Sequence, residues 1–262
     1  GDDEPYNSSY AAAQMLKFYS EINIGDIIII PGKNSLYLTI AEVTSGVYEQ
    51  NNIPSHSDVC PFIKRRRINV LKKTTRPSLN PEMQLMFNSR HIISNVDKYA
   101  EFIDSTIYDF YQKGGSTFLV LRVKQENEIN AIDFNLIPVI IEAIEKFALI
   151  ENFEFNREDI KMKICVQSPG DMLVFAQEHW EIIMLIGATI TWLKGVEIDV
   201  GKFAKFKVPS VFENISHLIN SYNNYLDRKV DRKFKETLRS KVENMEIDSP
   251  TNLTKILNEF NK

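Results

Sequence analysis

Three neighbouring stretches decide the predicted fold of this chain: GDIIIIPG (residues 25–32), SLYLTIAEVTSGVYEQ (residues 35–50) and PFIKRRRINVLKK (residues 61–73). They are rich in β-branched and aromatic residues, and turn residues separate them. Four consecutive isoleucines, residues 27–30, predict a strand that is buried on both faces, as in a closed barrel. We therefore expect residues 24–71 to form a small, SH3-like, five-stranded β-barrel with a cationic edge.

The composition is typical of a globular soluble protein. The chain has 262 residues, of which 44% are hydrophobic and 25% are charged. Its formal net charge of −4 excludes a molecule that is basic as a whole, so any cationic surface must be local. The first residues, GDDE, lack the pattern of a signal peptide, and the only two cysteines lie far apart. These features predict a cytoplasmic protein without a disulfide framework.

One strongly apolar segment, WEIIMLIGATITWL at residues 180–193, could be either a membrane span or a buried helix of a soluble protein. Its uncharged part covers residues 182–193 and is followed by Lys194. A helix needs about 20 apolar residues to span a bilayer. We therefore expect a buried helix and no membrane span.

The remaining pattern predicts an α+β chain in four parts. After the barrel and its N-terminal helix (residues 1–78), we expect a helical connector (79–115), a βαβα unit (116–200) and a helical tail (201–262). The connector pattern predicts a long helix whose apolar stripe runs from Val96 to Phe110 and which ends at the two glycines that follow.

The βαβα unit and the tail are predicted in more detail. Pro138 is compatible with the first turn of a helix or with a kink. Ser168-Pro169-Gly170 is interpreted as a tight turn rather than as an anion site, because no phosphate-loop motif follows. The predicted elements are a strand at 117–123, a helix at 133–149, a strand at 160–166, a helix at 172–193, and tail helices at 211–226, 230–245 and 253–260.

A run of cations is the pattern that points most directly to a partner. Residues 60–81 contain seven basic residues and no acidic residue. On a strand, Arg65 and Arg67 would point to one side, and guanidinium groups match the geometry of phosphate. The alternative is a solvated strand whose charges prevent edge-to-edge association. The candidate nucleic-acid-binding residues are Lys64, Arg65, Arg66, Arg67, Lys72 and Lys73.

Other patterns give weak signals for chemistry. His56 and Cys60 have a spacing that could suggest a metal pair, but no second pair follows, so we expect no metal. Asp159 and Lys161 form a single D-x-K element, which chance alone produces in a chain this rich in charge. We therefore expect no cofactor and no catalytic residue, and enzymatic activity is not the favoured interpretation.

The order of motifs in the first third resembles the N-terminal SH3-like module of bacterial Mrr-type restriction proteins and their relatives. The resemblance covers residues 18–111 and implies a role near DNA, in restriction or phage defence. Ala41 stands where that family usually has glycine, the tryptophan of its closing strand is missing, and its D…Q/E-x-K nuclease core is not found. The matching elements are Gly25-Asp26 with Pro31, Ala41-Glu42-Val43 with Gly46-Val47-Tyr48, and Arg66-Arg67-Ile68 with Val70-Leu71.

Three functional hypotheses follow. The leading one is a non-catalytic protein that associates with DNA or RNA in a bacterial defence system. The second is a protein-interaction scaffold that forms a homo-oligomer through residues 172–193 or the tail helices. The third is a Mg²⁺ nuclease that uses Asp159 and Lys161. The basic tail around residues 228–241 is either a solvated helix face or a second contact site.

Overall fold

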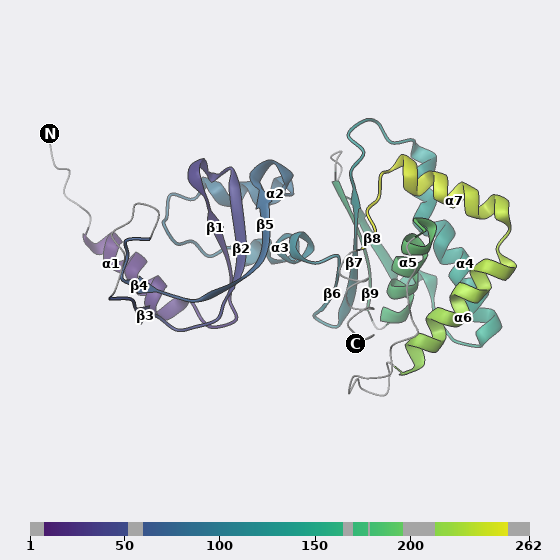
Figure 1. Cartoon of the computed structure of the whole chain (residues 1–262), viewed down its shortest axis with the longest axis horizontal. Coiled ribbons are helices and arrows are strands. Elements are labelled where there is room, and N and C mark those ends of the chain that lie inside the picture. The colour runs from purple at the N-terminus through teal and green to yellow at the C-terminus, as the bar shows by residue number, and fades with distance from the viewer. Residues whose placement is uncertain (1–7, 52–59, 165–169, 178, 196–212, 251–262) are drawn as a thin grey trace. The chain divides into compact units, whose positions relative to one another are not determined.

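The chain divides into two compact units, residues 1–107 and residues 108–262. Figure 1 shows the elements of each unit in chain order. The computed structural model describes residues 8–51, 60–164, 170–177, 179–195 and 213–250.

The first unit contains a three-stranded antiparallel sheet with the order β1-β2-β5. Its N-terminal helix α1 (Ser8–Leu16) continues as a π-helical turn (Lys17–Glu21). A separate short ribbon consists of two strands paired with each other, β3 and β4. The strands are β1 (Ile27–Pro31), β2 (Tyr37–Val43), β3 (Tyr48–Glu49), β4 (Lys64–Arg65) and β5 (Ile68–Thr75).

The described strands do not form the closed five-stranded barrel that we expected. β1 and β5 each pair only with β2, so both are outer strands of an open sheet. The isoleucine run is therefore not buried on both faces: Ile27 and Ile29 pack against the core, whereas Ile30 is 41% exposed. An outer strand with one face on the core buries only alternate side chains, and hydrophobicity alone does not reveal this.

The core of the first unit joins the sheet to the segment that follows it. Leu38 and Ile40 of β2 pack with Met83 of helix α2 (Pro81–Gln84) and with Ile103 of helix α3 (Ala100–Ile107). Much of the predicted connector, residues 79–115, is thus part of the hydrophobic core of the first unit rather than a separate link.

A β-bulge in the outer strand β5 changes which side chains share a face. Ile40 faces Lys72 and Ala41 faces Val70, so Leu71 has no partner in the register. Because the extra residue shifts the alternation, Val70 and Lys73 lie on the same face, and Lys72 lies on the other face with Ile40.

The second unit is built on a four-stranded antiparallel sheet with the order β6-β7-β9-β8. Gly114 and Gly115 connect the first two strands with φ values of 58° and 79°, a left-handed conformation that glycine adopts without strain. The strands are β6 (Phe110–Lys113), β7 (Ser116–Val123), β8 (Ile160–Ile164) and β9 (Gly170–Gln177).

Helices cover one side of this sheet, as Figure 1 shows, and α5 packs directly on β7 and β9. Pro138 lies in the first turn of α4, one of the two positions that its sequence context allowed, and its missing N–H costs no hydrogen bond there. The helices are α4 (Leu136–Glu151), α5 (Trp180–Leu193), α6 (Glu213–Lys229) and α7 (Arg232–Asn244).

Two predicted helices are wrong in part. Residues 172–177 of the expected helix 172–193 belong to β9, and only Trp180–Leu193 is helical. β9 is the second strand from the β8 edge, so side chains on both of its faces are buried and its sequence lacks strand alternation. The connector helix ends at Ile107, and Phe110 begins β6. Gly170, which was expected just before a helix, is the first residue of the strand β9. Residues 168–169, 211–212 and 253–260, which also belong to predicted elements, lie outside the described residues.

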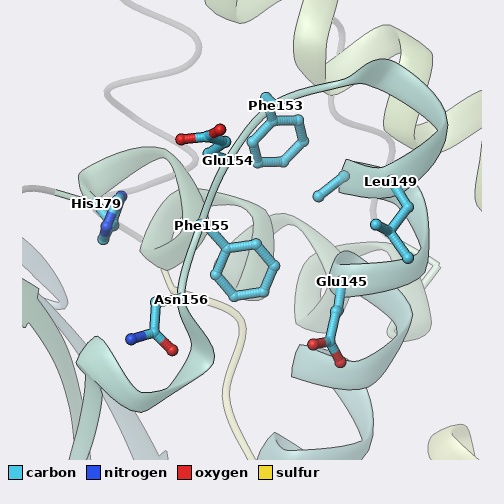
Figure 2. Close-up of a pocket in the computed structure, with 8 residues that line it drawn as sticks. Glu145, Leu149, Phe153, Glu154, Phe155, Asn156 and His179 are labelled. Atoms are coloured by element: carbon cyan, nitrogen blue, oxygen red, sulfur yellow. The ribbon is translucent and has the colours of Figure 1, made fainter.

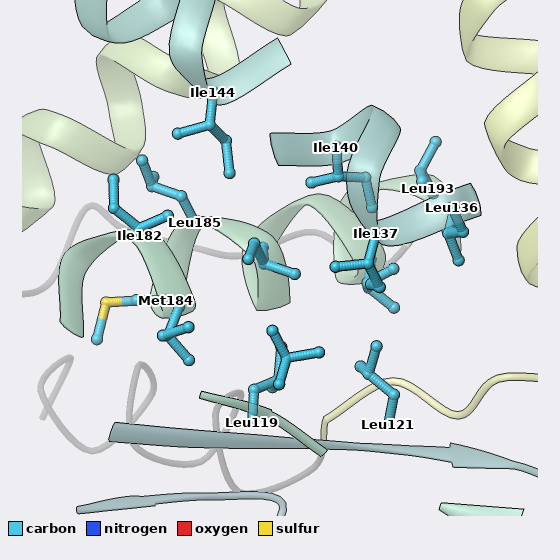
Figure 3. Close-up of a cluster of buried hydrophobic side chains, with 14 of the residues drawn as sticks. Leu119, Leu121, Leu136, Ile137, Ile140, Ile144, Ile182, Met184, Leu185 and Leu193 are labelled. Carbon is cyan, nitrogen blue, oxygen red and sulfur yellow. The ribbon is translucent and has the colours of Figure 1, made fainter. Parts of the chain in front are cut away.

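The core of the second unit lies between the sheet and helices α4 and α5. Figure 3 shows Leu119 and Leu121 of β7 beneath Ile140 of α4 and Leu185 of α5. The prediction of a buried helix for the apolar segment is confirmed, because α5 is buried along almost its whole length. None of the described helices is long and apolar enough to cross a membrane.

A buried ion pair connects the short turn Ala131–Asn135 to α7. Lys241 Nζ lies 3.5 Å from Asp133 Oδ1, and their side chains are only 9% and 6% exposed. The ammonium group also donates to the carbonyl oxygen of Ile132 at 2.6 Å, and Asn244 Nδ2 donates to Asp133 Oδ2 at 3.3 Å. These contacts satisfy two charges that would otherwise be costly to bury.

Tyr222 of α6 makes stability sensitive to alkaline pH. Burial raises the pKa of its phenol above the ordinary value, and the Thr189 hydroxyl donates to its oxygen at 3.0 Å. Since the folded state holds this proton more tightly, the stabilisation is complete below the unfolded-state pKa of about 10 and is lost as pH rises above it.

We expect Tyr222→Phe to cost about 1 kcal/mol near neutral pH, because one buried hydrogen bond is removed. The same variant should lose less stability than the wild type between about pH 8 and about pH 11, because the buried ionisable group is gone. Guanidinium unfolding followed by tryptophan fluorescence measures both effects. Tyr108→Phe, at a half-buried position of the same unit, is the matched control and should keep the wild-type pH dependence.

Candidate nucleic-acid interface

Arg66 of the basic run faces the interior of the first unit. Its Nε and Nη2 atoms donate to the carbonyl oxygen of Phe18 at 3.1 and 2.8 Å, and Nη2 also reaches the carbonyl of Tyr19 at 3.2 Å. Nη1 donates to the carbonyl oxygen of Ser45 at 3.2 Å, and the guanidinium group lies over the Phe18 ring. Arg66 thus binds the π-helical turn to the strands.

Lys72 also has an internal role. The bulge turns it toward the helical side of the sheet, where its Nζ donates to the carbonyl oxygen of Thr106 at 2.6 Å. Thr106 lies in the last turn of α3, where carbonyl groups lack helical partners and a cation is favourable.

Arg65 and Arg67 are both related to Tyr48, but in different ways. Arg65 faces Tyr48 across the β3–β4 ribbon, and the Arg67 guanidinium lies over the Tyr48 ring at 5.7 Å. Arg67 lies between β4 and β5, so the strand alternation that we expected for Arg65 and Arg67 does not apply to it. Arg65 is held by the carbonyl oxygens of Cys60 and Phe62 at 2.7 and 2.9 Å. The Arg65 guanidinium is therefore fixed by carbonyl groups of its own segment, and the Arg67 guanidinium lies on the ring of Tyr48.

Lys64 and Lys73 are exposed cations with different surroundings. Lys64 faces Glu49 across the ribbon and lies over the Tyr19 ring at 5.0 Å, and a hydrogen bond with the Tyr19 side chain raises the pKa of Lys64. Lys73 lies in one cross-strand row with Thr39 and Ile30. Both groups therefore carry charge into solvent at neutral pH.

The sheet face that carries Lys73 has an exposed apolar surface, which the sequence did not reveal. Ile30, Tyr37 and Val70 on this face are 41%, 66% and 47% exposed. The bulge at Leu71 brings Val70 and Lys73 to this side. No feature of the sequence marks the position of the bulge, so the composition of this face could not be predicted.

The proposed nuclease element is not assembled. The Asp159 carboxylate faces His179, with Oδ2 3.4 Å from Nε2, whereas Lys161 Nζ donates to the carbonyl oxygen of Glu158 at 2.7 Å. Within the described part of the chain, no group of three His, Cys, Asp or Glu side chains could hold a metal ion. Cys60 is exposed, and His56 lies outside the described residues.

The basic tail helices use several cations within the second unit. Arg239 Nε donates to the carbonyl oxygen of Leu193 at 3.0 Å, and Lys235 lies over the Trp192 ring at 3.8 Å. Arg232 pairs with Glu236 on the exposed face of α7 at 2.9 Å. The tail therefore offers fewer cations for an outside partner than its sequence suggests.

Comparison with other proteins adds no relative from which a role could be transferred. No family model, no curated protein and no solved structure matches the chain. Its function must therefore be inferred from its own residues, of which Tyr48, the cross-strand partner of Arg65 and the ring under Arg67, is the common neighbour of two cations in the basic segment.

Proposed function

We propose that the first unit binds nucleic acid without catalysis, through Arg65, Arg67 and Tyr48. The observation that carries the proposal is that the Arg67 guanidinium lies over the Tyr48 ring, while Arg65 is the cross-strand partner of Tyr48 in the β3–β4 ribbon. Guanidinium groups bind phosphate oxygens bidentately, and an aromatic ring next to them stacks on a base. Lys64 and Lys73 would add outer phosphate contacts.

Local charge supports the same partner. The segment from residue 60 to residue 81 has no acidic side chain, although the whole chain has a net charge of −4. A local cationic surface on an otherwise acidic protein attracts a polyanion at one place rather than over the whole surface. The resemblance of residues 18–111 to the Mrr-type module favours DNA as the nucleic acid and bacterial restriction or phage defence as its setting.

The internal contacts refine the set of candidate residues. Arg66 and Lys72 make part-buried hydrogen bonds to carbonyls of distant segments, those of Phe18 and Thr106, so they support the surface rather than contact the ligand. The bonds of Arg65 are exposed and go to its own segment, so they hold its guanidinium at the surface. The proposed contact set is therefore Lys64, Arg65, Arg67 and Lys73, with Tyr48 as the stacking ring.

We expect the double variant Arg65→Glu/Arg67→Glu to weaken binding of a fluorescent 20-nucleotide DNA by about tenfold or more at low salt. The slope of log affinity against log salt should fall by about one for each phosphate that the protein no longer neutralises. Fluorescence anisotropy at several salt concentrations, with single-stranded and duplex DNA, measures both quantities.

The matched control is Arg90→Glu/Lys229→Glu, which reverses two exposed cations elsewhere in the chain. This control changes the net charge by the same amount and should retain most of the binding. The proposal fails if the wild type shows no salt-dependent binding, or if both double variants lose affinity equally.

Self-association remains the second hypothesis, but the structure does not favour the surface first considered for it. Residues 172–193 contribute a strand and a helix to the core of the second unit, where Val174 and Leu185 are fully buried. The apolar sides of α6 and α7 pack into the same core through Tyr222 and Leu238. These described elements therefore leave no wide apolar face for a second copy.

A further inference from the structure

A cavity of about 550 Å³ opens in the second unit where α4 ends. Figure 2 shows that its side chains come from the end of α4, from the chain that follows, and from His179 just before α5. Its volume lies within the range of pockets that hold small organic molecules. The described lining residues are Glu145, Ala148, Leu149, Phe153, Glu154, Phe155, Asn156 and His179.

The backbone around the cavity is fixed by local hydrogen bonds. Asn152 ends α4 in the left-handed conformation with a φ of 53°, and the N–H of Phe153 donates to the carbonyl oxygen of Ala148 at 3.2 Å. Asn156 then begins the turn Arg157–Asp159, accepting from the N–H of Glu158 at 3.0 Å. The loop is therefore formed before any ligand arrives, and little ordering is required on binding.

Aromatic rings form the apolar part of the cavity. Phe153 packs edge-on against Phe147 of the core with ring centres 6.0 Å apart, and Phe155 stacks on Phe153 at 6.4 Å. Both rings are half-buried, and Leu149 beside them is 76% exposed. The core thus holds the rings in place while they remain open to the cavity.

Carboxylates outnumber cations at the cavity. The described lining includes the carboxylates Glu145 and Glu154 and no lysine or arginine. Arg157, which is outside the lining, has its Nη1 atom 3.5 Å from Glu145 Oε2. Asp159 adds a further carboxylate, whose Oδ2 atom lies 3.4 Å from Nε2 of His179. Three carboxylates and one arginine therefore create a negative potential at a site with aromatic walls.

We propose that this cavity binds an organic cation, namely an ammonium group carried on a hydrocarbon body. Aromatic faces attract cations and also bury apolar groups, and the carboxylates favour a positive charge. Asn156 and His179 supply the polar groups that would orient the ammonium hydrogens. The same charges disfavour phosphates, so this site is chemically unlike the proposed nucleic-acid surface and does not depend on it.

Three small probes of similar shape test whether the cavity prefers a positively charged ligand. Isothermal titration of the full chain at pH 7 with 2-phenylethylamine should show binding. The neutral 2-phenylethanol should bind about tenfold more weakly, and the anion phenylacetate more weakly still. Equal affinity for the amine and the alcohol, or no binding of the amine, would overturn the proposal.

Two variants then test whether the amine binds in this cavity. Glu154→Gln removes one lining carboxylate from an exposed position and should weaken amine binding about fivefold without changing the unfolding midpoint. Phe155→Leu removes the ring and should weaken amine binding by a similar factor. Glu158→Gln, outside the lining, is the matched control. Loss of affinity in Glu158→Gln equal to that in Glu154→Gln would show a general charge effect and contradict the site.

Discussion

Asp133→Ala should destabilise the second unit by about 3 kcal/mol, because it leaves the Lys241 ammonium buried without its carboxylate. The remaining hydrogen bond to the carbonyl of Ile132 does not neutralise the charge. Both tryptophans of the chain, Trp180 and Trp192, lie in this unit, so guanidinium unfolding followed by their fluorescence reports on it directly.

Two comparisons separate this effect from a general loss of charge. Glu142→Ala breaks an exposed pair with Lys146, whose side chains are 55% and 62% exposed, and should cost less than about 0.5 kcal/mol. The double variant Asp133→Leu/Lys241→Met should recover much of the stability, since it leaves no unpaired buried charge. Equal costs for Asp133→Ala and Glu142→Ala would contradict the assigned role of the buried pair.

Arg66→Ala should destabilise the first unit by about 2 kcal/mol, because three backbone carbonyls lose a charged donor. The largest effect should appear in the π-helical turn Lys17–Glu21, which Arg66 binds to the strands. Hydrogen exchange followed by mass spectrometry measures this locally, as faster exchange in peptides that cover the turn and α1.

Arg67→Ala is the natural control, because it removes a neighbouring guanidinium that is exposed and lies over Tyr48. It should change stability by no more than about 0.5 kcal/mol. Arg66→Lys should not restore stability fully, since a single ammonium group cannot reproduce the forked donor geometry. If both arginines gave the same exchange pattern, Arg66 would not have the structural role that its contacts indicate.

The sequence predicted the α+β class and most helices of the second unit, because those signals are local. The period of apolar residues and the position of Pro138 placed α4 within a few residues. The apolar segment 180–193 was correctly expected to be a buried helix, because its length is too short for a bilayer.

The wrong predictions concern segments whose structure depends on the neighbouring strands rather than on the local sequence pattern. Residues 172–177 form a strand inside a sheet, and burial on both faces removes the alternation that marks an edge strand. The four isoleucines that suggested a closed barrel form an outer strand instead. Both cases depend on which strands become neighbours, and single-sequence patterns do not contain that information.

The sequence indicated which cations belong to the candidate surface, but not which of them make internal contacts. The sequence marks Arg65, Arg66 and Arg67 as equivalent cations, yet Arg66 points to backbone carbonyls of a segment far away in the chain. Lys72 and Lys73 point to opposite faces, as adjacent strand residues do, and the bulge, which has no sequence signature here, places Val70 on the face of Lys73. The acidic, aromatic cavity was missed because its residues give no spaced motif.

The strand order of the second unit has a consequence for how this unit folds. β6 with β7 and β8 with β9 are hairpins between strands that follow each other in the chain, so each closes a short loop. The central pairing of β7 with β9 instead encloses α4 and the whole of β8, a far longer loop with a larger entropic cost. We therefore expect the middle of the sheet to join after its two outer halves, and α5, which lies on both central strands, to acquire its complete docking surface only at that late step.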